Sequence, residues 1–507
     1  MANSRSLRLH LLLLLFLTQS DVALAASFTQ EELAFMPAST QIELFKNGII
    51  SPVDVLNAQI NLFNKTNKEV NAATKTFFSA ALQQAKIAES RYRMGNYRAL
   101  EGITVGLKDE HYDKGWPVSQ GSLLHKNDPV KEEADPITQK LKDAGAILVM
   151  QTTVPEFYLT FATHSKAWGV TRNPWNLAYS VGGSSGGSGA ALAAGYVTLA
   201  TGSDMGGSIR IPSSLCGLYG YKPAFGEVHT EMPFSHYSGT GPMARTFADL
   251  VLMENIISGP TKYSLNVHPT KKLPLSYPSI QGMKIAYVGG LGIANPSREV
   301  QEAMEQAIDL LKKQGAVIDK IDLNLGLSDE ELNELFRKMA LGGPMGGMLQ
   351  HYTDQTDNMT SYAAHFVKLA ARGEYGSKQS QEAETRAKLM YKMIVDETFA
   401  KGYDVIIAPT LVTPNIPADY DFTKDKIKID GTQYHPQLGV LMTMPFNILN
   451  WMPVINVPVA LSKQGIPIGM QIIGRAQDTR TVFKVAFNYS KSGPKFFTGE
   501  LLPKIYS

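Results

Sequence analysis

The segment DPITQKLKDAGAILVM, residues 135–150, contains a complete helix-to-strand transition. Asp135 followed by Pro136 predicts the start of a helix, because an acidic N-cap and a proline in the first turn both favour one. Gly145 predicts the end of that helix, and the apolar run at 146–150 predicts a short buried strand. The segment therefore indicates a strand covered by a helix, which is the repeating unit of an α/β protein.

The same pattern recurs along the chain. Residues 283–288 read as a strand, Ser297 as the cap of a helix with one apolar face, and 316–321 as the next strand. Residues 103–107 and 403–408 are further apolar runs. Strands without polar alternation are buried on both faces. We therefore predict an α/β fold whose large mixed, mostly parallel sheet is flanked by helices on both faces.

The composition narrows the class of protein. The chain has 507 residues, with 48 Lys+Arg against 46 Asp+Glu, and its net charge of +2 disfavours nucleic acid as the main partner. Hydrophobic residues make up 44% and charged residues 19%, which is typical of a packed globular protein. The one cysteine, Cys216, excludes an intrachain disulfide framework and a cysteine-based zinc site.

The N-terminus has the pattern of a secretory signal peptide. Arg5 and Arg8 precede the apolar run at 11–17, and the small residues at 23–26 follow it. We predict that residues 1–25 are a signal peptide, cleaved near Ala25, and that the protein is exported to the periplasm or secreted. The alternative is an uncleaved membrane anchor, although the apolar run is shorter than the roughly 20 residues that span a bilayer.

The rest of the chain shows no composition break. We predict that residues 26–507 form a single catalytic domain, in which 264–400 is a variable, mainly helical region with a flexible Gly/Met segment at 341–348. The apolar stretch at 439–461 is interrupted by prolines and asparagines, so it indicates buried strands and turns. We expect no membrane span after signal cleavage.

A glycine- and serine-rich run, GGSSGGSGAA, occupies residues 182–191. A flexible linker is one interpretation, but the apolar segment at 190–200 that follows looks like a buried helix. A phosphate loop lacks its Gly-Lys-Ser/Thr ending. A third interpretation is the G-x-S-x-G turn of a serine hydrolase with Ser185 as its central serine, which would need an acid and a histidine downstream, such as Asp404 and His435.

A second glycine pair lies at Met205-Gly206-Gly207-Ser208. Consecutive glycines let backbone N–H groups converge on one point, which is what an oxyanion hole requires. Ser208 would present its hydroxyl beside those donors. The alternative is an ordinary Gly-Gly turn.

Lys108 directly follows the apolar strand predicted at 103–107. It is either a surface lysine at a strand tip or a buried one. Charged groups are rarely buried without a partner. If it is buried, desolvation lowers its pKa, and the neutral amine can act as a base near pH 7–8.

Together, these segments resemble the amidase signature family. The resemblance is carried by residues 182–191, 204–212 (DMGGSIRIP), 216–223 (CGLYGYKP), 241–249 (GPMARTFAD) and 465–475 (GIPIGMQIIGR). It implies the fold of that family, hydrolysis of an amide bond, and no metal or organic cofactor. The chain departs from the family at Asn450-Trp451-Met452-Pro453, where a smaller turn is usual, and at Ala224, where a threonine is usual.

The resemblance also implies roles for individual residues. Lys108 matches the family's catalytic lysine, Ser184 its bridging serine after a cis peptide bond (here Gly183–Ser184), and Ser208 its nucleophile. The backbone of Met205, Gly206, Gly207 and Ser208 matches the oxyanion hole. The residues expected to support the loop through hydrogen bonds are Ser185, Asp204 and Arg210. We assign no role to His111.

The expected activity is that of an exported amidase acting on a small-molecule or peptide amide, whether peptide-like, oligoamide or small organic. Three alternatives stay open: a serine esterase with its nucleophile at Ser185, one component of a tRNA-dependent amidotransferase, and a catalytically silent binding scaffold. The signal peptide and the near-neutral charge argue against the amidotransferase. We expect no nucleic-acid partner and allow for a homodimer.

Overall fold

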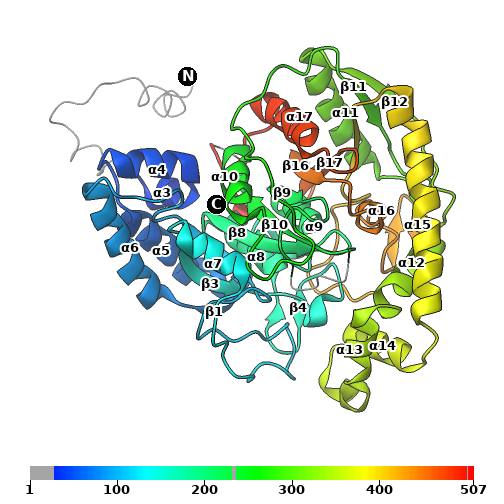
Figure 1. Ribbon diagram of the computed structural model, residues 1–507, viewed down its shortest axis with the longest axis horizontal. Coiled ribbons are helices and arrows are strands. Elements are labelled where there is room, and N and C mark those ends of the chain that lie inside the picture. The colour runs from blue at the N-terminus through cyan, green and yellow to red at the C-terminus, as the bar shows by residue number, and fades with distance from the viewer. Residues whose placement is uncertain (1–27, 231–235, 500, 507) are drawn as a thin grey trace.

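The computed structural model describes residues 28–230, 236–499 and 501–506, so the predicted signal peptide at 1–25 lies outside the described residues. The centre of the molecule is an 11-stranded sheet (Figure 1). In spatial order its strands are β1 (Ala73–Thr76), β3 (Ile147–Thr152), β2 (Thr104–Lys108), β8 (Leu199–Asp204), β10 (Gly239–Ala244), β9 (Tyr219–Lys222), β16 (Val454–Leu461), β17 (Pro467–Ile473), β13 (Val405–Pro409), β11 (Lys284–Tyr287) and β12 (Val317–Lys320).

The predicted large mixed sheet with flanking helices is confirmed, but parallel pairs are not its majority. β2 pairs in parallel with β3 and β8, and β11 with β12 and β13, whereas the strands from β8 across to β13 all pair antiparallel. The sequence pattern missed this middle section because β9 (YGYK) and β10 (GTGPMA) are not apolar runs. Antiparallel neighbours also need no crossover helix that would reveal them.

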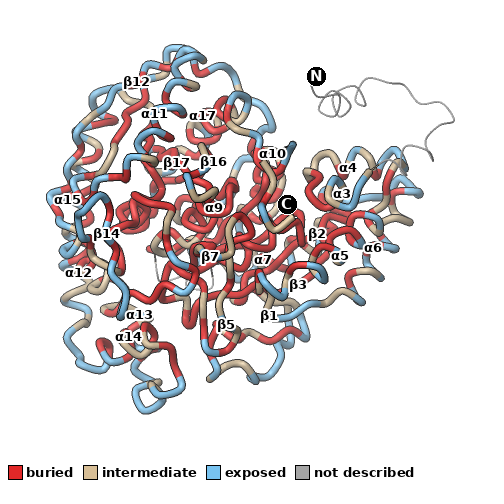
Figure 2. The backbone as a smooth tube through the Cα atoms, turned by 180° about the vertical axis from the view of Figure 1, so that it is seen from behind, coloured by how far each residue is buried: buried red, intermediate tan, exposed pale blue. Residues whose placement is uncertain are grey.

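Helices cover both faces of the sheet. In β13, Val405 and Ile407 belong to one buried cluster, and Ile406 and Ala408 to the other, as alternation along a strand requires. The first cluster includes apolar residues of α10 (Phe247–Ile257), α11 (Arg298–Lys313) and α17 (Thr479–Ser492). The second includes those of α8 (Gly186–Ala193) and α9 (Arg210–Cys216). Figure 2 shows this buried interior in red, with exposed chain around it.

The remaining helices lie mainly at the two ends of the sheet (Figure 1). Near the end of the sheet that β1 and β3 form are the helices of the N-terminal part of the chain: α3 (Gln30–Phe35), α4 (Ala38–Lys46), α5 (Pro52–Val70), α6 (Phe78–Arg93) and α7 (Pro136–Asp143). At the other end are α12 (Asp329–Leu341), α13 (Pro344–Gln350), α14 (Ser361–Ala371), α15 (Ser377–Glu397) and the short α16 (Pro445–Ile448). Two-stranded sheets are formed by β4 (His164–Ser165) with β5 (Gly169–Val170), β6 (Arg172–Asn173) with β7 (Asn176–Ser180), and β14 (Ile427–Ile429) with β15 (Thr432–Tyr434).

The sequence predicted where helices begin more accurately than how long they are. Asp135 caps α7 as predicted, accepting the N–H groups of Ile137 at 2.9 Å and Thr138 at 3.0 Å. Ser297 stands at the N-cap position of α11, but its hydroxyl makes no capping bond.

That residues 26–507 form one domain stays a prediction. Within the described residues, no helix combines the length and the apolar character that crossing a bilayer demands.

Two local predictions are wrong. The helix expected at 190–200 ends at Ala193, because Gly195 turns the chain with φ +63°, and β8 follows. The second half of the glycine-rich run, from Gly186 on, forms the first part of this helix. The flexible segment expected at 341–348 is mostly helical, since α12 ends at Leu341 and Pro344 begins α13 after two glycines.

Candidate active site

Lys108 is the last residue of β2, which lies between β3 and β8. Its side chain is fully buried, so the surface alternative is wrong. The ammonium nitrogen Nζ donates to Ser184 Oγ at 2.9 Å and to Ser203 Oγ at 2.6 Å. Its third neighbour is Glu110, whose Oε2 lies 3.3 Å away.

Burial lowers the pKa of Lys108, while the carboxylates of Glu110 and Asp204 oppose that shift. Desolvation disfavours the ammonium form, because a charge loses more hydration than a neutral amine does. The neutral base therefore becomes accessible at lower pH than for an exposed lysine. This is the electrostatic condition that a lysine base requires.

Ser184 lies on the turn that leads into α8, and it is 2% exposed. The peptide bond from Gly183 to Ser184 is cis, which confirms that expectation. The glycines that follow permit close packing: a Cβ on Gly187 would lie 2.2 Å from the backbone nitrogen of Thr153. The linker interpretation of the run therefore fails.

The loop from Met205 to Ser208 joins β8 to α9. Asp204 Oδ1 accepts the N–H of Gly207 at 2.7 Å, and Gly207 has φ +122°, a conformation that favours glycine. One of the four predicted oxyanion donors is thus already engaged. No hydrogen bond among the described residues uses the N–H of Met205, Gly206 or Ser208. These three groups are available to a ligand.

Arg210 holds this loop in place through Asp204. Its Nε and Nη2 each donate to the Asp204 carboxylate at 2.9 Å, and both side chains are fully buried. Further donors of Arg210 reach Gln471 Oε1 at 2.6 Å and Asn447 Oδ1 at 2.5 Å. Burial alone would raise the pKa of Asp204, but Arg210 holds it well below its usual range. The pair fixes the loop that carries Ser208.

The segments that carry Ser184 and Ser208 are joined by one backbone hydrogen bond. The N–H of Ser185 donates to the carbonyl oxygen of Ser208 at 3.2 Å. No hydrogen bond within the described chain joins the hydroxyls of Ser184 and Ser208. The Lys108–Ser184 half of the predicted relay is therefore formed in this structure, and the Ser184–Ser208 half is not.

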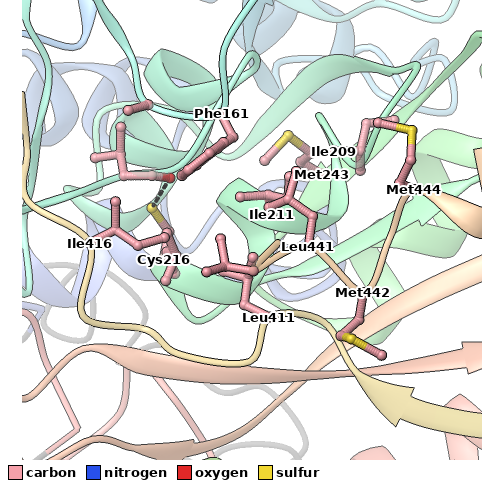
Figure 3. Packing of buried hydrophobic residues seen from close by; sticks show 14 of the residues in the cluster. Phe161, Ile209, Ile211, Cys216, Met243, Leu411, Ile416, Leu441, Met442 and Met444 are labelled. Carbon is pink, nitrogen blue, oxygen red and sulfur yellow. Dashed lines mark hydrogen bonds between the residues drawn. The ribbon is translucent and has the colours of Figure 1, made fainter. Parts of the chain in front are cut away.

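Ser208 is partly exposed and faces a small hollow of about 60 Å³. The hollow is lined by Tyr158, Leu159, Thr160, Phe161, Gly183, Met205, Gly206, Ser208, Ile211, Phe336, Met345, Gln437, Leu438, Leu441 and Met444. Figure 3 shows Phe161, Ile211, Leu441 and Met444 within the buried apolar cluster around it. The figure also shows Cys216, whose Sγ donates to the carbonyl oxygen of Val181 at 3.6 Å.

Ser185 cannot serve as a hydrolase nucleophile in this arrangement. It is fully buried, and its hydroxyl bonds to the backbone of Ser203 at 3.3 Å. His435 lies instead against Glu330, at 3.4 Å, and Asp404 accepts the N–H of Lys284 at 2.9 Å. The residues that a Ser185 triad would need are engaged elsewhere.

Two neighbours of Lys108 were missed by the sequence analysis. Glu110 stands two positions after the lysine and Ser203 directly before Asp204, so both lie beside residues that the sequence had singled out. By contrast, Asn447 approaches Arg210 from a distant segment and gave no local signal, whereas Gln471 lies in the segment 465–475 that carries the family resemblance but was not itself assigned a role. Over the described residues, no group of three or more His, Cys, Asp or Glu side chains could hold a metal ion.

Comparison with known proteins places this geometry in a family. The family model named Amidase matches residues 54–483. The chain belongs to the amidase signature family. This amidase is 30% identical to one of the subunits of glutamyl-tRNA(Gln) amidotransferase from Agathobacter rectalis, over 89% of this chain and 93% of that protein. It is 29% identical to the protein of the same name from Gloeothece citriformis, over 87% of this chain and 94% of the relative.

Solved structures have the same fold. A bacterial aryl acylamidase of the amidase signature family superimposes with a TM-score of 0.83 at 25% identity, over 91% of this amidase and 97% of that chain. A 6-aminohexanoate cyclic dimer hydrolase gives a TM-score of 0.81 at 23% identity, over 94% and 99% of the two chains. Family and fold together make the protein an amide hydrolase.

Removing the charge of Asp204 should destabilise this amidase strongly. We expect Asp204→Asn to lower the free energy of unfolding by about 3–5 kcal/mol, because Arg210 would stay buried without its carboxylate. Denaturant unfolding followed by circular dichroism measures the change. The control is Glu302→Gln, which breaks the exposed pair between Glu302 and Arg298 and should cost about 1 kcal/mol or less. Equal losses in both variants would contradict the role given to Asp204.

Proposed function

We propose that this amidase cleaves its substrate through an acyl-enzyme on Ser208, with Lys108 as the base and Ser184 as the proton relay. The observation that carries the proposal is the hydrogen bond of 2.9 Å between the fully buried Lys108 amine and Ser184. Ser208 lies in the adjacent loop and borders the hollow. Lys108 and Ser184 are thus in contact, and Ser208 is close to the space where a substrate could bind.

In the acylation half, neutral Lys108 accepts the proton of the Ser184 hydroxyl, and Ser184 accepts that of Ser208. The Ser208 hydroxyl must first turn toward Ser184, since no bond joins them in this structure. Its oxygen then bonds to the amide carbon, and the carbonyl oxygen becomes an anion. The free N–H groups around Gly206 stabilise that anion.

The tetrahedral intermediate then collapses. Ser184 donates a proton to the nitrogen of the leaving amine, the C–N bond breaks, and protonated Lys108 returns a proton to Ser184. In the second half, water loses a proton along the same relay and attacks the ester carbon. Ser208 leaves with its proton restored, and the acid is released. The residues end in the states in which they began.

For the substrate we propose a small amide with an apolar acyl group. The lining of the hollow comes mainly from aliphatic, aromatic and methionine side chains, and such pockets select by shape and apolar burial. Similarity at 25% identity to a protein named an aryl acylamidase supports this class. Small organic amides suit this mainly apolar lining better than long peptides, whose backbone groups need polar partners when they are buried.

The alternative that this protein belongs to a tRNA-dependent amidotransferase is favoured by the names of the two relatives described above. A glutamine substrate carries charged or polar groups on its α-carbon, three carbons from the reacting amide carbon, and burying them requires matching partners. Among the described residues that line the hollow, none carries a charged side chain. A glutamine substrate is therefore the weaker candidate.

We also propose that the protein is exported. The support is the order of basic residues at 5 and 8, the apolar run at 11–17 and the small residues at 23–26. Mature protein recovered outside the cytoplasm should begin near residue 26. A full-length N-terminus there would contradict the proposal.

The nucleophile assignment has a direct test. We expect Ser208→Ala to lower kcat for amides by at least about a thousandfold, because the acyl-enzyme cannot form. A panel of anilides, alkyl amides and esters with varied acyl chains measures the loss. Ser185→Ala is the informative comparison: abolished turnover there with activity retained in Ser208→Ala would establish the esterase alternative instead.

The apolar hollow predicts a change in acyl preference. Met345→Ala removes a lining side chain on α13, so kcat/KM for longer acyl chains should rise relative to short ones by about tenfold. Met348→Ala is the matched control, since Met348 lies on the same helix and is 37% exposed. Identical acyl preferences in both variants would show that this hollow does not bind the acyl group.

A further inference from the structure

Glu110 follows the strand that ends at Lys108, on a tight turn in which its own N–H donates to the Lys108 carbonyl at 2.6 Å. The turn brings its side chain back against the lysine. Oε2 lies 3.3 Å from the Lys108 amine, and Oε1 lies 3.5 Å from His111 Nε2. The Glu110 side chain is 20% exposed, whereas that of Lys108 is fully buried.

The Lys108 amine therefore has three neighbours that accept hydrogen bonds or attract its charge: Ser184, Ser203 and Glu110. An ammonium group has three N–H donors and no lone pair, so it suits all three at once. A neutral amine has two N–H groups and one lone pair. When Ser203 and Glu110 take the two N–H groups, the lone pair is left facing Ser184.

We propose that Glu110 is a positioning residue for the amidase reaction, which aims the Lys108 amine at Ser184 and sets the pH at which that amine becomes a base. The inference rests on the proposed function of Lys108. It assigns Glu110 no contact with the substrate, and Glu110 does not line the hollow beside Ser208.

The other carboxylates near Lys108 form hydrogen bonds with other groups. Asp204 attracts the ammonium, but its carboxylate is bound to Arg210 at 2.9 Å. The Asp109 carboxylate accepts a hydrogen bond from the N–H of Ser119 at 3.0 Å. Among the described residues, Glu110 is the carboxylate in direct contact with the amine.

Two further groups shape the site. His111 lies between Glu110 and the Oδ1 atom of Asp135, 3.5 Å from each. Burial works against the charged imidazolium, but Asp135 and Glu110 together raise the pKa of His111, and a charged His111 would disfavour the Lys108 ammonium. The ring of Tyr158 covers the amine, with its centroid 5.0 Å from Nζ.

The sign of the effect follows from the charge. An ionised Glu110 stabilises the Lys108 ammonium and so raises the pKa of that lysine against the larger effect of burial. The reaction needs the neutral amine, so activity rises as pH passes upward through this ionisation. Removing the Glu110 charge makes the amine neutral at lower pH. The acid limb of the pH–rate profile should then move to lower pH.

The experiment measures kcat and KM against pH for Glu110→Gln and the native enzyme, with one anilide substrate. We expect the acid limb of kcat/KM to move down by about one to three pH units. The plateau kcat should stay within about tenfold, since the amide oxygen of glutamine still accepts a hydrogen bond. Glu132→Gln, the same change at an exposed loop position, should leave the profile unchanged.

Two more variants separate orientation from charge. Ser203→Ala removes one partner of the amine without removing a charge, so kcat should fall by about tenfold or more while the acid limb moves less than in Glu110→Gln. Glu110→Asp keeps the charge with a shorter reach, so it should lower kcat with a smaller movement of the limb than Glu110→Gln causes. This variant also tests the proposal if Glu110→Gln fails to fold.

An acid limb that stays in place in Glu110→Gln, or moves to higher pH, would overturn the role of Glu110. If Ser208→Ala is inactive in the same assay, the proposed function survives that result and only the present inference fails. If Ser208→Ala is active, the proposed function itself fails. The two failures are therefore distinguishable.

Discussion

The burial of a single amine is the constraint on which this site depends. A lysine at the end of a central strand loses its water, and its charged form is then stable only through local partners. Lys108 finds two hydroxyls and one carboxylate, and each comes from a different part of the fold. The packing of β2 between β3 and β8 is what makes the amine a potential base.

The second buried cation of the site, Arg210, stabilises the structure and is not proposed as a base. Arg210 is bound to Asp204 by two hydrogen bonds and is also held by Gln471 and Asn447, so the loop between Asp204 and Arg210 stays fixed. One buried cation therefore supplies a titratable group, and the other supplies rigidity. The difference lies in the partners: a bidentate carboxylate for the arginine, and mainly hydroxyls for the lysine.

Sequence reasoning reached what short segments encode. The strand beside Lys108 and the cap at Asp135 follow from neighbouring residues, whereas the roles expected of Ser184 and Ser208 came from the resemblance to the family. The antiparallel centre did not follow, because β10 contains glycine and proline and pairs with segments whose position only the folded chain decides. The same holds for the hollow, since α12 and α13 bring Phe336 and Met345 to Ser208 from far along the chain.

The most direct test is the pH dependence of the first turnover. Quenched reactions with an activated p-nitroanilide, analysed by peptide mass spectrometry, give the rate at which the peptide containing Ser208 gains the acyl group. In the native enzyme that rate should rise with pH through one ionisation, and in Lys108→Ala it should be far slower and lose that ionisation. Acylation at another residue, or the same pH profile in both proteins, would contradict the account.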